Sequence, residues 1–182
     1  DMESKKELKK SNLPICIMHK KEKLSPMSIC EEVSNFFENK ISDLTSFGID
    51  ANRIIIDPGF GYGKTPKENI NLLANFDYSS FSNKSLVGLS RKGFLKKISI
   101  KDDLDDVSIS AAIISSLRGA SIIRVHNVAD TMKKMGEILE AGADRPHIVE
   151  IYSPPRVTNF AEEWGLTPGL AMDLSLIHIS EP

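Results

Sequence analysis

The sequence predicts an α/β fold built on a parallel sheet, and two observations carry this prediction. Four short apolar runs recur, beginning at Ile15, Ile54, Ser85 and Ser121, and their starts lie 31 to 39 residues apart. Each interval is long enough for a helix with two loops, and segments of helical periodicity occupy the intervals. Strands joined by such long crossovers pair in parallel.

The first elements follow in a regular order. Residues 2–10 are rich in Glu and Lys and predict a surface helix. A strand is expected over 15–18 (ICIM). A helix is then expected over 27–47, where apolar residues recur close to every 3.6 positions and Gly48 follows as a C-cap. The next strand is expected over 54–56 (III).

The later elements repeat this alternation. A shorter helix is expected over 66–75, with a proline at its first position. Strands are expected over 85–89 (SLVGL) and 121–125 (SIIRV), with a helix over 105–118 between them. A last helix is expected over 129–141. From residue 142 onward five prolines and three glycines interrupt the chain, and no further alternation of strand and helix is evident.

Composition and charge exclude several classes of protein. The chain has 182 residues, of which 41% are hydrophobic and 26% charged, as expected for one soluble globular domain. A formal net charge of −2 gives no field for generic nucleic-acid binding, and no apolar run approaches the roughly 20 residues that span a bilayer. The charged N-terminus is not a signal peptide, and Cys16 and Cys30 lack metal-ligand spacing. We therefore expect a cytoplasmic protein without nucleic-acid or membrane partners.

Polar side chains follow all four predicted strands at the same end of each. His19 follows the first strand, Asp57 the second and Ser90–Lys92 the third, while Arg124 and His126 lie within and after the fourth. Ligands of parallel α/β folds bind at the carboxyl ends of the strands, so we expect one shared pocket. Its cations suit an anionic ligand such as a phosphate or carboxylate, and its carboxylate suits a ligand with N–H donors.

Most of these groups also have a simpler structural interpretation. Asp57-Pro58-Gly59 can be a turn without a functional role, although Phe60 and Tyr62 add apolar bulk that a turn does not need. Ser90–Lys92 can be a solvated loop. His19 can be a hydrogen-bonded residue at a strand end.

Other features are interpreted as structural or excluded. Cys16 and Met18 are expected in the core, although Met18 is also a candidate for a pocket floor. The lysines at 20, 21 and 23 are expected on a solvated face. Residues 61–65 (GYGKT) end like a phosphate-binding P-loop, but that motif needs a glycine where this chain has Pro58.

Four segments together resemble the dihydropteroate synthases, a pterin-binding family. Residues 54–64 (IIIDPGFGYGK) resemble the family signature, and 14–19 (PICIMH), 87–92 (VGLSRK) and 124–126 (RVH) resemble its fifth, seventh and eighth strands. The resemblance covers about residues 1–140. It implies a (β/α)₈ TIM-type barrel, which needs about 250 residues, so residues 1–141 are interpreted as its C-terminal half, about strands 5–8. Residues 142–182 are left as an unassigned tail, interpreted as foreign sequence.

The resemblance also implies a transferase of folate biosynthesis. The family condenses 4-aminobenzoate with 6-hydroxymethyl-7,8-dihydropterin diphosphate to give 7,8-dihydropteroate and diphosphate. Mg²⁺ assists with the charge of the leaving group, and its protein ligand is expected outside this half of the barrel. The full-length protein is expected to be a homodimer. The fragment alone is expected to be weakly active or inactive, because a half barrel exposes two sheet edges.

The resemblance assigns catalytic roles to two residues. Asp57 is implied to bind the amino and ring N–H groups of the pterin, and Lys92 to lie between the pterin and the aminobenzoate. Arg124 and His126 are implied to hold the diphosphate.

Four more residues are implied to bind substrate: Met18 at the pterin face, Gly59 in the signature loop, Tyr62 against the aminobenzoate and Ser90 near it. Tyr62 stands where the family often has Phe. In the same way, Gly93 stands where Ser is frequent and Asn127 where aspartate is common.

Two alternative functions stay open. One is another pterin-binding barrel, such as a methyltetrahydrofolate methyltransferase, which has no need for both Ser90-Arg91-Lys92 and Arg124-Val125-His126. The other is a non-catalytic half barrel that only pairs with another barrel half.

Overall fold

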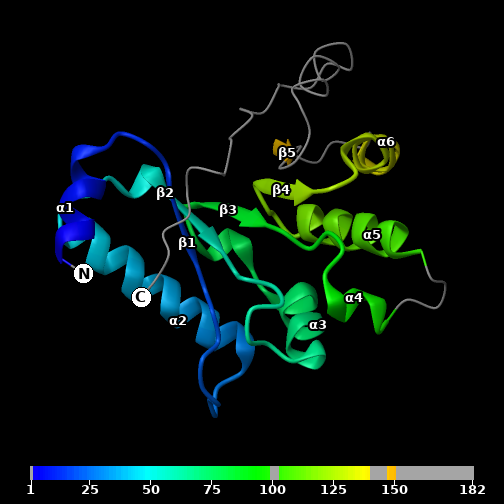
Figure 1. The fold of residues 1–182 in the computed structure, drawn as a ribbon, viewed down its shortest axis with the longest axis horizontal. Helices are drawn as coiled ribbons and strands as arrows, with labels where there is room; N and C mark the ends of the chain where they lie inside the picture. Colours follow the sequence, from blue (N-terminus) through cyan, green and yellow to red (C-terminus); the bar gives the residue numbers. More distant parts are fainter. Residues whose placement is uncertain (1, 99–102, 140–146, 151–182) are drawn as a thin grey trace.

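In the computed structural model, residues 2–98, 103–139 and 147–150 are described, and they form one parallel sheet with helices packed beside it (Figure 1). The strands are β1 (Ile15–Met18), β2 (Ile54–Asp57), β3 (Lys84–Val87), β4 (Ile122–Val125) and β5 (His147–Glu150). They pair in chain order, each parallel to its neighbour. A doubly wound sheet reverses its strand order at a switch point, whereas this uninterrupted order is that of a barrel segment.

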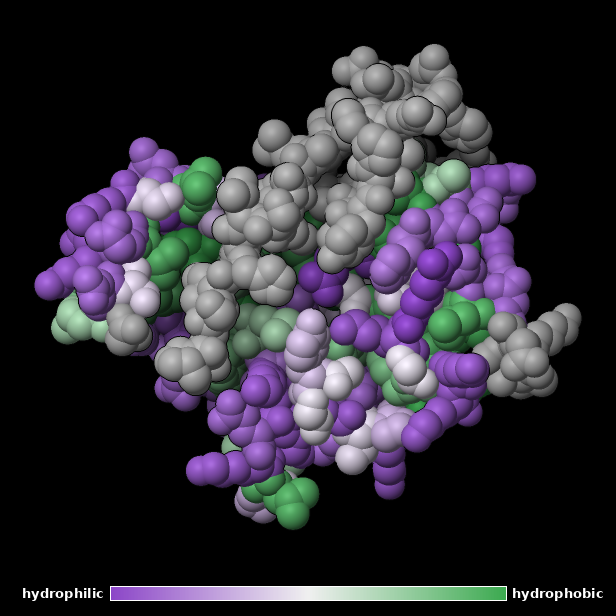
Figure 2. Space-filling model, in the orientation of Figure 1, coloured by the Kyte–Doolittle hydropathy of each residue, from purple (hydrophilic) through white to green (hydrophobic). Residues whose placement is uncertain are grey.

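The helices follow the predicted alternation closely. They are α1 (Met2–Lys10), α2 (Ile29–Ser46), α3 (Pro66–Asn75), α4 (Gly93–Lys96), α5 (Leu104–Leu117) and α6 (Val128–Leu139), with short 3₁₀ helices η1 (Ala51–Arg53) and η2 (Tyr78–Ser80). Neighbouring helices pack on one another in the order α2, α3, α5, α6 along one side of the sheet (Figure 1). Helix α1 has no buried residue, and Figure 2 shows hydrophilic residues over it.

Local sequence explains where two of these helices begin. Ser28 precedes α2, and its side chain accepts from the backbone N–H of Glu31, whose carboxylate in turn accepts from the Ser28 N–H. Thr65 and Glu68 form the same reciprocal pair at α3, where Pro66 takes the first helical position. These capping boxes satisfy N–H groups that a helix start leaves without partners.

One strand and one α-helix were not predicted, nor were the two 3₁₀ helices. Strand β5 lies in the segment for which no strand was expected, and it pairs with β4 from Ile122↔His147 to Val125↔Glu150. Helix α4 has only four residues, which is too short to show helical periodicity. The rest of the unassigned tail lies outside the described residues.

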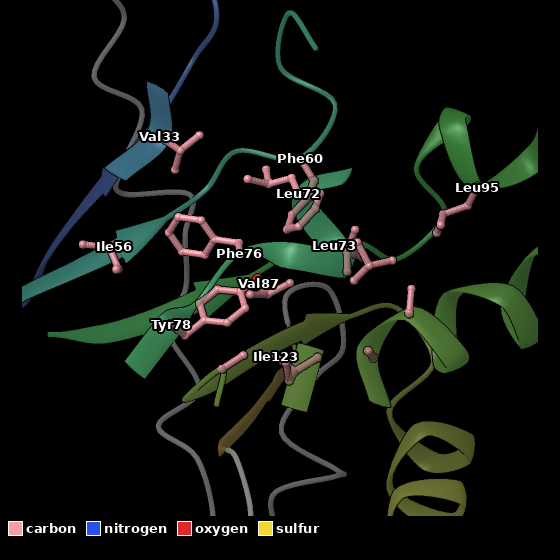
Figure 3. Close-up of a cluster of buried hydrophobic side chains, with 14 of the residues drawn as sticks. Val33, Ile56, Phe60, Leu72, Leu73, Phe76, Tyr78, Val87, Leu95 and Ile123 are labelled. Atoms are coloured by element: carbon pink, nitrogen blue, oxygen red, sulfur yellow. The ribbon is translucent and has the colours of Figure 1, made fainter. Parts of the chain in front are cut away.

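The main core lies between the sheet and its helices. Ile56, Val87 and Ile123, one from each of three successive strands, are at most 1% exposed and pack with Leu72 and Phe76 (Figure 3). Successive strand residues point to opposite faces. The residues directly before and after each of these core positions therefore point to the other face of the sheet, away from the helices.

No helix within the described part of the chain combines the length and the apolar composition needed to cross a membrane.

Candidate active site

Asp57 ends strand β2 on the sheet face away from the helices, because its neighbour Ile56 points into the helix-side core. Its register partner is Met18 at the end of β1. Asp57 is 4% exposed, and its Oδ1 accepts a hydrogen bond of 2.8 Å from the Gly59 N–H. Burial raises the pKa of Asp57. The Gly59 N–H and then the charges of Arg124 and Lys92 oppose that rise.

Arg124 lies on the same face from β4. A Cβ placed on Gly88 would come within 2.6 Å of Arg124 Nη2 and 2.7 Å of its Nε, so the guanidinium occupies the space that a side chain at position 88 would fill. Glycine therefore lets this cation lie against the backbone that follows β3.

Lys92 brings a second cation to this end of the sheet. Its Nζ lies 4.5 Å from the centroid of the Tyr62 ring, in a cation–π contact. Burial lowers the pKa of Lys92, as does the charge of Arg124, whereas Asp57 opposes the shift. The charges of Asp57, Lys92 and Arg124 influence one another's pKa values, so the three side chains lie near one another at this end of the sheet.

Ser90 and His126 meet at the neighbouring strand ends. Ser90 Oγ accepts from the His126 backbone N–H at 3.2 Å and lies 2.9 Å from His126 Nδ1. Burial is the first cause that lowers the pKa of His126, and the charge of Arg91 adds to it. Both residues were predicted here, and their mutual contact fixes the orientation of the imidazole.

The loop after Asp57 depends on glycine geometry. Gly59 has φ +66°, and a Cβ there would lie 1.9 Å from the His19 carbonyl oxygen. Gly63 has φ +69° and would meet the Lys21 carbonyl at the same distance. Phe60 is buried and stacks on Phe94, so it anchors the loop in the core, whereas Tyr62 is 39% exposed.

Two polar residues that hold this loop were not predicted. Lys64 is buried, and its Nζ donates to the carbonyls of Gly59 (2.8 Å) and His19 (3.1 Å). Burial lowers the pKa of Lys64 to about 8. Asn69 is 1% exposed; its Oδ1 accepts from the Gly61 N–H at 2.7 Å and its Nδ2 donates to the Lys64 carbonyl. Lys64 is the last residue of the signature segment 54–64, but nothing in that sequence pattern indicates that its side chain holds the loop.

His19 does not enter the pocket, so the expectation of two imidazoles there is wrong. Its backbone N–H donates to the Asp57 carbonyl at 3.0 Å, while its ring turns toward helix α2. There Nε2 lies 3.4 Å from Glu32 Oε1, and the ring packs edge-on against Phe36. Strand alternation explains this, because His19 follows Met18, which pairs in register with Asp57.

We expect stability to fall as the pH drops from about 6.5 to about 4. Burial lowers the pKa of His19 from 6.5 to about 4, with the charge of Lys64 next in effect. Between these values the unfolded chain binds a proton that the folded chain excludes. The free energy of unfolding should therefore decrease by up to about 1.4 kcal/mol per pH unit. Urea unfolding at several pH values measures this dependence. His19→Gln should lose it, so a free energy of unfolding in His19→Gln that falls with pH as steeply as in the wild type would contradict the prediction.

Two other residues differ from their predicted places, Lys21 and Cys16. Lys21 is not on a solvated face: its side chain is 8% exposed and pairs with Glu68 and with Glu32 at 3.6 Å. Lys20 is exposed as expected. Cys16 is exposed rather than in the core, because it lies on the sheet face away from the helices.

Two of the three departures from the family, Asn127 and Gly93, lie at the starts of helices. Asn127 directly precedes helix α6; its Oδ1 accepts from the Asp130 N–H at 3.2 Å and its Nδ2 donates to the Asp130 carboxylate at 2.7 Å. Gly93 begins α4, and a Cβ placed on it would meet no atom within 4 Å.

Comparisons with known proteins agree on one family. The model of the pterin binding enzyme family matches residues 1–126. Dihydropteroate synthase from Escherichia coli (strain K12) is 34% identical over 142 residues, covering 72% of this chain and 50% of the relative. The chain thus spans about half the length of the curated relatives it matches.

Solved structures give the same result. Dihydropteroate synthase from Xanthomonas albilineans in complex with 7,8-dihydropteroate matches with a TM-score of 0.70 and 28% identity, covering 78% of this chain and 56% of that one. The Yersinia pestis enzyme in a sulfonamide complex matches with a TM-score of 0.68 and 32% identity, covering 76% and 54%. This chain belongs to the pterin binding enzyme family.

Proposed function

We propose that this chain is part of a dihydropteroate synthase. Such an enzyme condenses 6-hydroxymethyl-7,8-dihydropterin diphosphate with 4-aminobenzoate to give 7,8-dihydropteroate and diphosphate. The observation that carries the proposal is the buried Asp57 carboxylate on the same sheet face as Arg124, with Lys92 beside them. A relative and a solved structure named for this activity support it.

Asp57 is proposed to select the pterin. A buried carboxylate accepts hydrogen bonds and donates none when ionised, so it suits the amino and ring N–H groups of a pterin. Met18 is half-buried beside it and is proposed to contact the pterin face. The Gly59 backbone approaches the end of β1 so closely that a Cβ there would lie 3.2 Å from Met18 Cγ.

Lys92 is proposed to act at the reaction centre. The aniline nitrogen attacks the pterin methylene carbon, the C–O bond to diphosphate breaks, and diphosphate leaves with the electron pair while the nitrogen releases a proton. A fixed cation beside that carbon stabilises the negative charge that develops on the leaving oxygen. Tyr62, whose ring contacts Lys92, and Ser90, two residues before Lys92, are proposed to contact the aminobenzoate.

Arg124 and His126 are proposed to hold the diphosphate. The guanidinium is a fixed charge with several N–H donors that match phosphate oxygens. The contact between Ser90 Oγ and His126 Nδ1 leaves the other ring nitrogen of His126 available to a ligand.

Magnesium is proposed to assist with the charge of the diphosphate, held by ligands outside this part of the barrel. No group of three or more His, Cys, Asp or Glu side chains that could hold a metal occurs among the described residues. Asp57 accepts from the Gly59 N–H and lies near the cations Arg124 and Lys92, so it is not proposed as a magnesium ligand. No magnesium ligand is therefore assigned among the described residues.

The place of the chain in the barrel, its dimerisation and its cytoplasmic location remain proposals. The C-terminal half of the barrel is favoured by the order of the four segments that resemble the signature and the fifth, seventh and eighth strands. The uninterrupted parallel strand order supports a barrel segment of either half.

The proposed function is tested by substrate binding and by reconstituted turnover. Calorimetry measures binding of 6-hydroxymethylpterin diphosphate to this chain. The chain is also co-expressed with the part of a relative's barrel that it does not match, and dihydropteroate is measured by chromatography. We expect Lys92→Met to lower turnover about 100-fold or more. The matched control is Lys20→Met, an exposed lysine whose Nζ lies 3.9 Å from Glu22. Absence of pterin binding, or equal turnover in the two variants, would contradict the proposal.

Gly88→Ala is expected to weaken binding of inorganic diphosphate about tenfold, equivalent to about 1.4 kcal/mol. The new Cβ would displace the Arg124 guanidinium, whose atoms lie 2.6 to 2.9 Å from its position. A guanidinium at the end of a flexible side chain can move, so the fold should persist. Gly93→Ala is the control, since its Cβ meets nothing within 4 Å. Calorimetry measures both, and unchanged affinity in Gly88→Ala would count against a diphosphate site at Arg124.

A further inference from the structure

Arg91 has an unusual backbone conformation. Its φ is +58°, and it is the one non-glycine residue with positive φ among those the structure describes. A side chain in this left-handed region is disfavoured sterically, so the surrounding contacts must offset the strain.

Helix α5 supplies those contacts through two residues near its start. The Arg91 backbone N–H donates to Ser108 Oγ at 2.9 Å. The Arg91 side chain forms a bidentate pair with Asp105, from Nε to Oδ1 at 2.9 Å and from Nη2 to Oδ2 at 3.0 Å. Asp105 and Ser108 therefore hold both the main chain and the side chain of Arg91.

These two residues are themselves fixed in place. Ser108 Oγ donates to the Leu104 carbonyl at 2.6 Å, and the Asp105 N–H donates to Asp103 Oδ1 at 3.0 Å. The first turns of α5 thus form a rigid support for the loop that follows β3.

The residues on either side of Arg91 belong to the site. Ser90 contacts His126, and Lys92 lies over Tyr62. A change of φ at position 91 would alter the directions in which these two neighbours point. The strained conformation is thus the link between helix α5 and the site.

We propose that Asp105 is a positioning residue, which holds Arg91 in its left-handed conformation and thereby places Ser90 and Lys92. A surface ion pair of this kind contributes little stability by itself, so its effect is on loop geometry rather than on folding. The catalytic consequence rests on the proposed function, whereas the geometric consequence does not.

The test uses rescue by glycine. In Asp105→Ala the arginine keeps its strain but loses its partner, so the loop should relax. In the double variant Arg91→Gly/Asp105→Ala, glycine adopts positive φ without steric strain, so the loop should return to its wild-type conformation. The double variant is thus expected to disturb the site less than Asp105→Ala alone, although it lacks both partners of the ion pair. A simple loss of charge would not produce this outcome.

The first readout is the His126 imidazole in nitrogen NMR spectra of the free chain. Ser90 Oγ lies 2.9 Å from His126 Nδ1, so a change in this contact in Asp105→Ala should shift the ring-nitrogen signals, and the double variant should restore them. Asp105 also raises the pKa of His126, so spectra are recorded at pH 8, where the imidazole is neutral. The second readout is turnover in the reconstituted enzyme, where Asp105→Ala should lower kcat about tenfold and the double variant should recover most of that loss.

Asp106→Ala is the matched control. Asp106 is the next residue of the same helix and pairs with Lys134 of α6, away from the loop. Its removal should leave the His126 signals and turnover unchanged. Wild-type His126 signals in Asp105→Ala, or signals in the double variant as shifted as those in Asp105→Ala, would overturn the proposal. Restored signals in a protein that never forms dihydropteroate would instead overturn the proposed function and leave the positioning role standing.

Discussion

Asp57→Asn is expected to abolish measurable pterin binding and to lower turnover about 1000-fold or more. The substitution places an amide N–H₂ group where the ligand offers its own N–H donors, so two donors face each other in a buried site. Polar mismatches of this kind cost far more than the loss of an apolar contact. Calorimetry and the turnover assay measure the two effects.

The same substitution should not destabilise the chain. Burial raises the pKa of Asp57, which means that the fold penalises the charged form of this carboxylate. The neutral amide avoids that penalty, and its oxygen can still accept from the Gly59 N–H. Asp50→Asn is the control, because Asp50 is exposed and only caps η1 by accepting from the Asn52 N–H. Pterin affinity in Asp57→Asn within threefold of the control would contradict the assignment.

Gly59→Ala is expected to destabilise the chain by about 3 to 4 kcal/mol, which is large for a single methyl group. The Cβ would lie 1.9 Å from the His19 carbonyl oxygen and 3.0 Å from its carbon, at φ +66°. Both neighbours are backbone atoms of the residue that follows β1, so relief requires the loop and the strand end to separate. Urea unfolding measures the change in free energy.

Gly136→Ala provides a control of opposite sign. Gly136 lies inside helix α6, and its Cβ would meet nothing within 4 Å. Alanine is favoured over glycine in a helix, so this variant should be about 0.5 to 1 kcal/mol more stable. An unfolding midpoint of Gly59→Ala equal to that of the wild type would show that the loop does not depend on this close approach.

The fold was predictable because its signals are local. Apolar runs recur at intervals that hold a helix, Gly48 follows the end of α2 and Pro66 takes the first position of α3. Strand β5 escaped prediction because its four residues lie among prolines and glycines that mask a short strand signal.

The candidate site was predictable for residues that lie at strand ends. Asp57, Lys92 and Arg124 lie together because the carboxyl ends of parallel strands share one edge. His19 was misplaced because the face on which a strand residue lies depends on register, which one sequence does not reveal.

The contacts that hold the site could not be predicted for a different reason. Lys64 reaches the His19 carbonyl across 45 positions of sequence, and Arg91 reaches Asp105 across 14. Such pairs depend on the packing of distant segments, and no periodicity or motif spacing records them.

The most direct test of the account is a titration of the nitrogen-15-labelled chain with 6-hydroxymethylpterin diphosphate, followed by amide NMR. We predict saturable shifts for Gly59, Gly61, Lys92 and residues 124–127, and no such shifts in Asp57→Asn. A separate cleft is lined by Met27, Cys30, Asp77 and their neighbours. Shifts confined to that cleft would contradict a pterin diphosphate site at these strand ends, and so would a response that Asp57→Asn leaves unchanged.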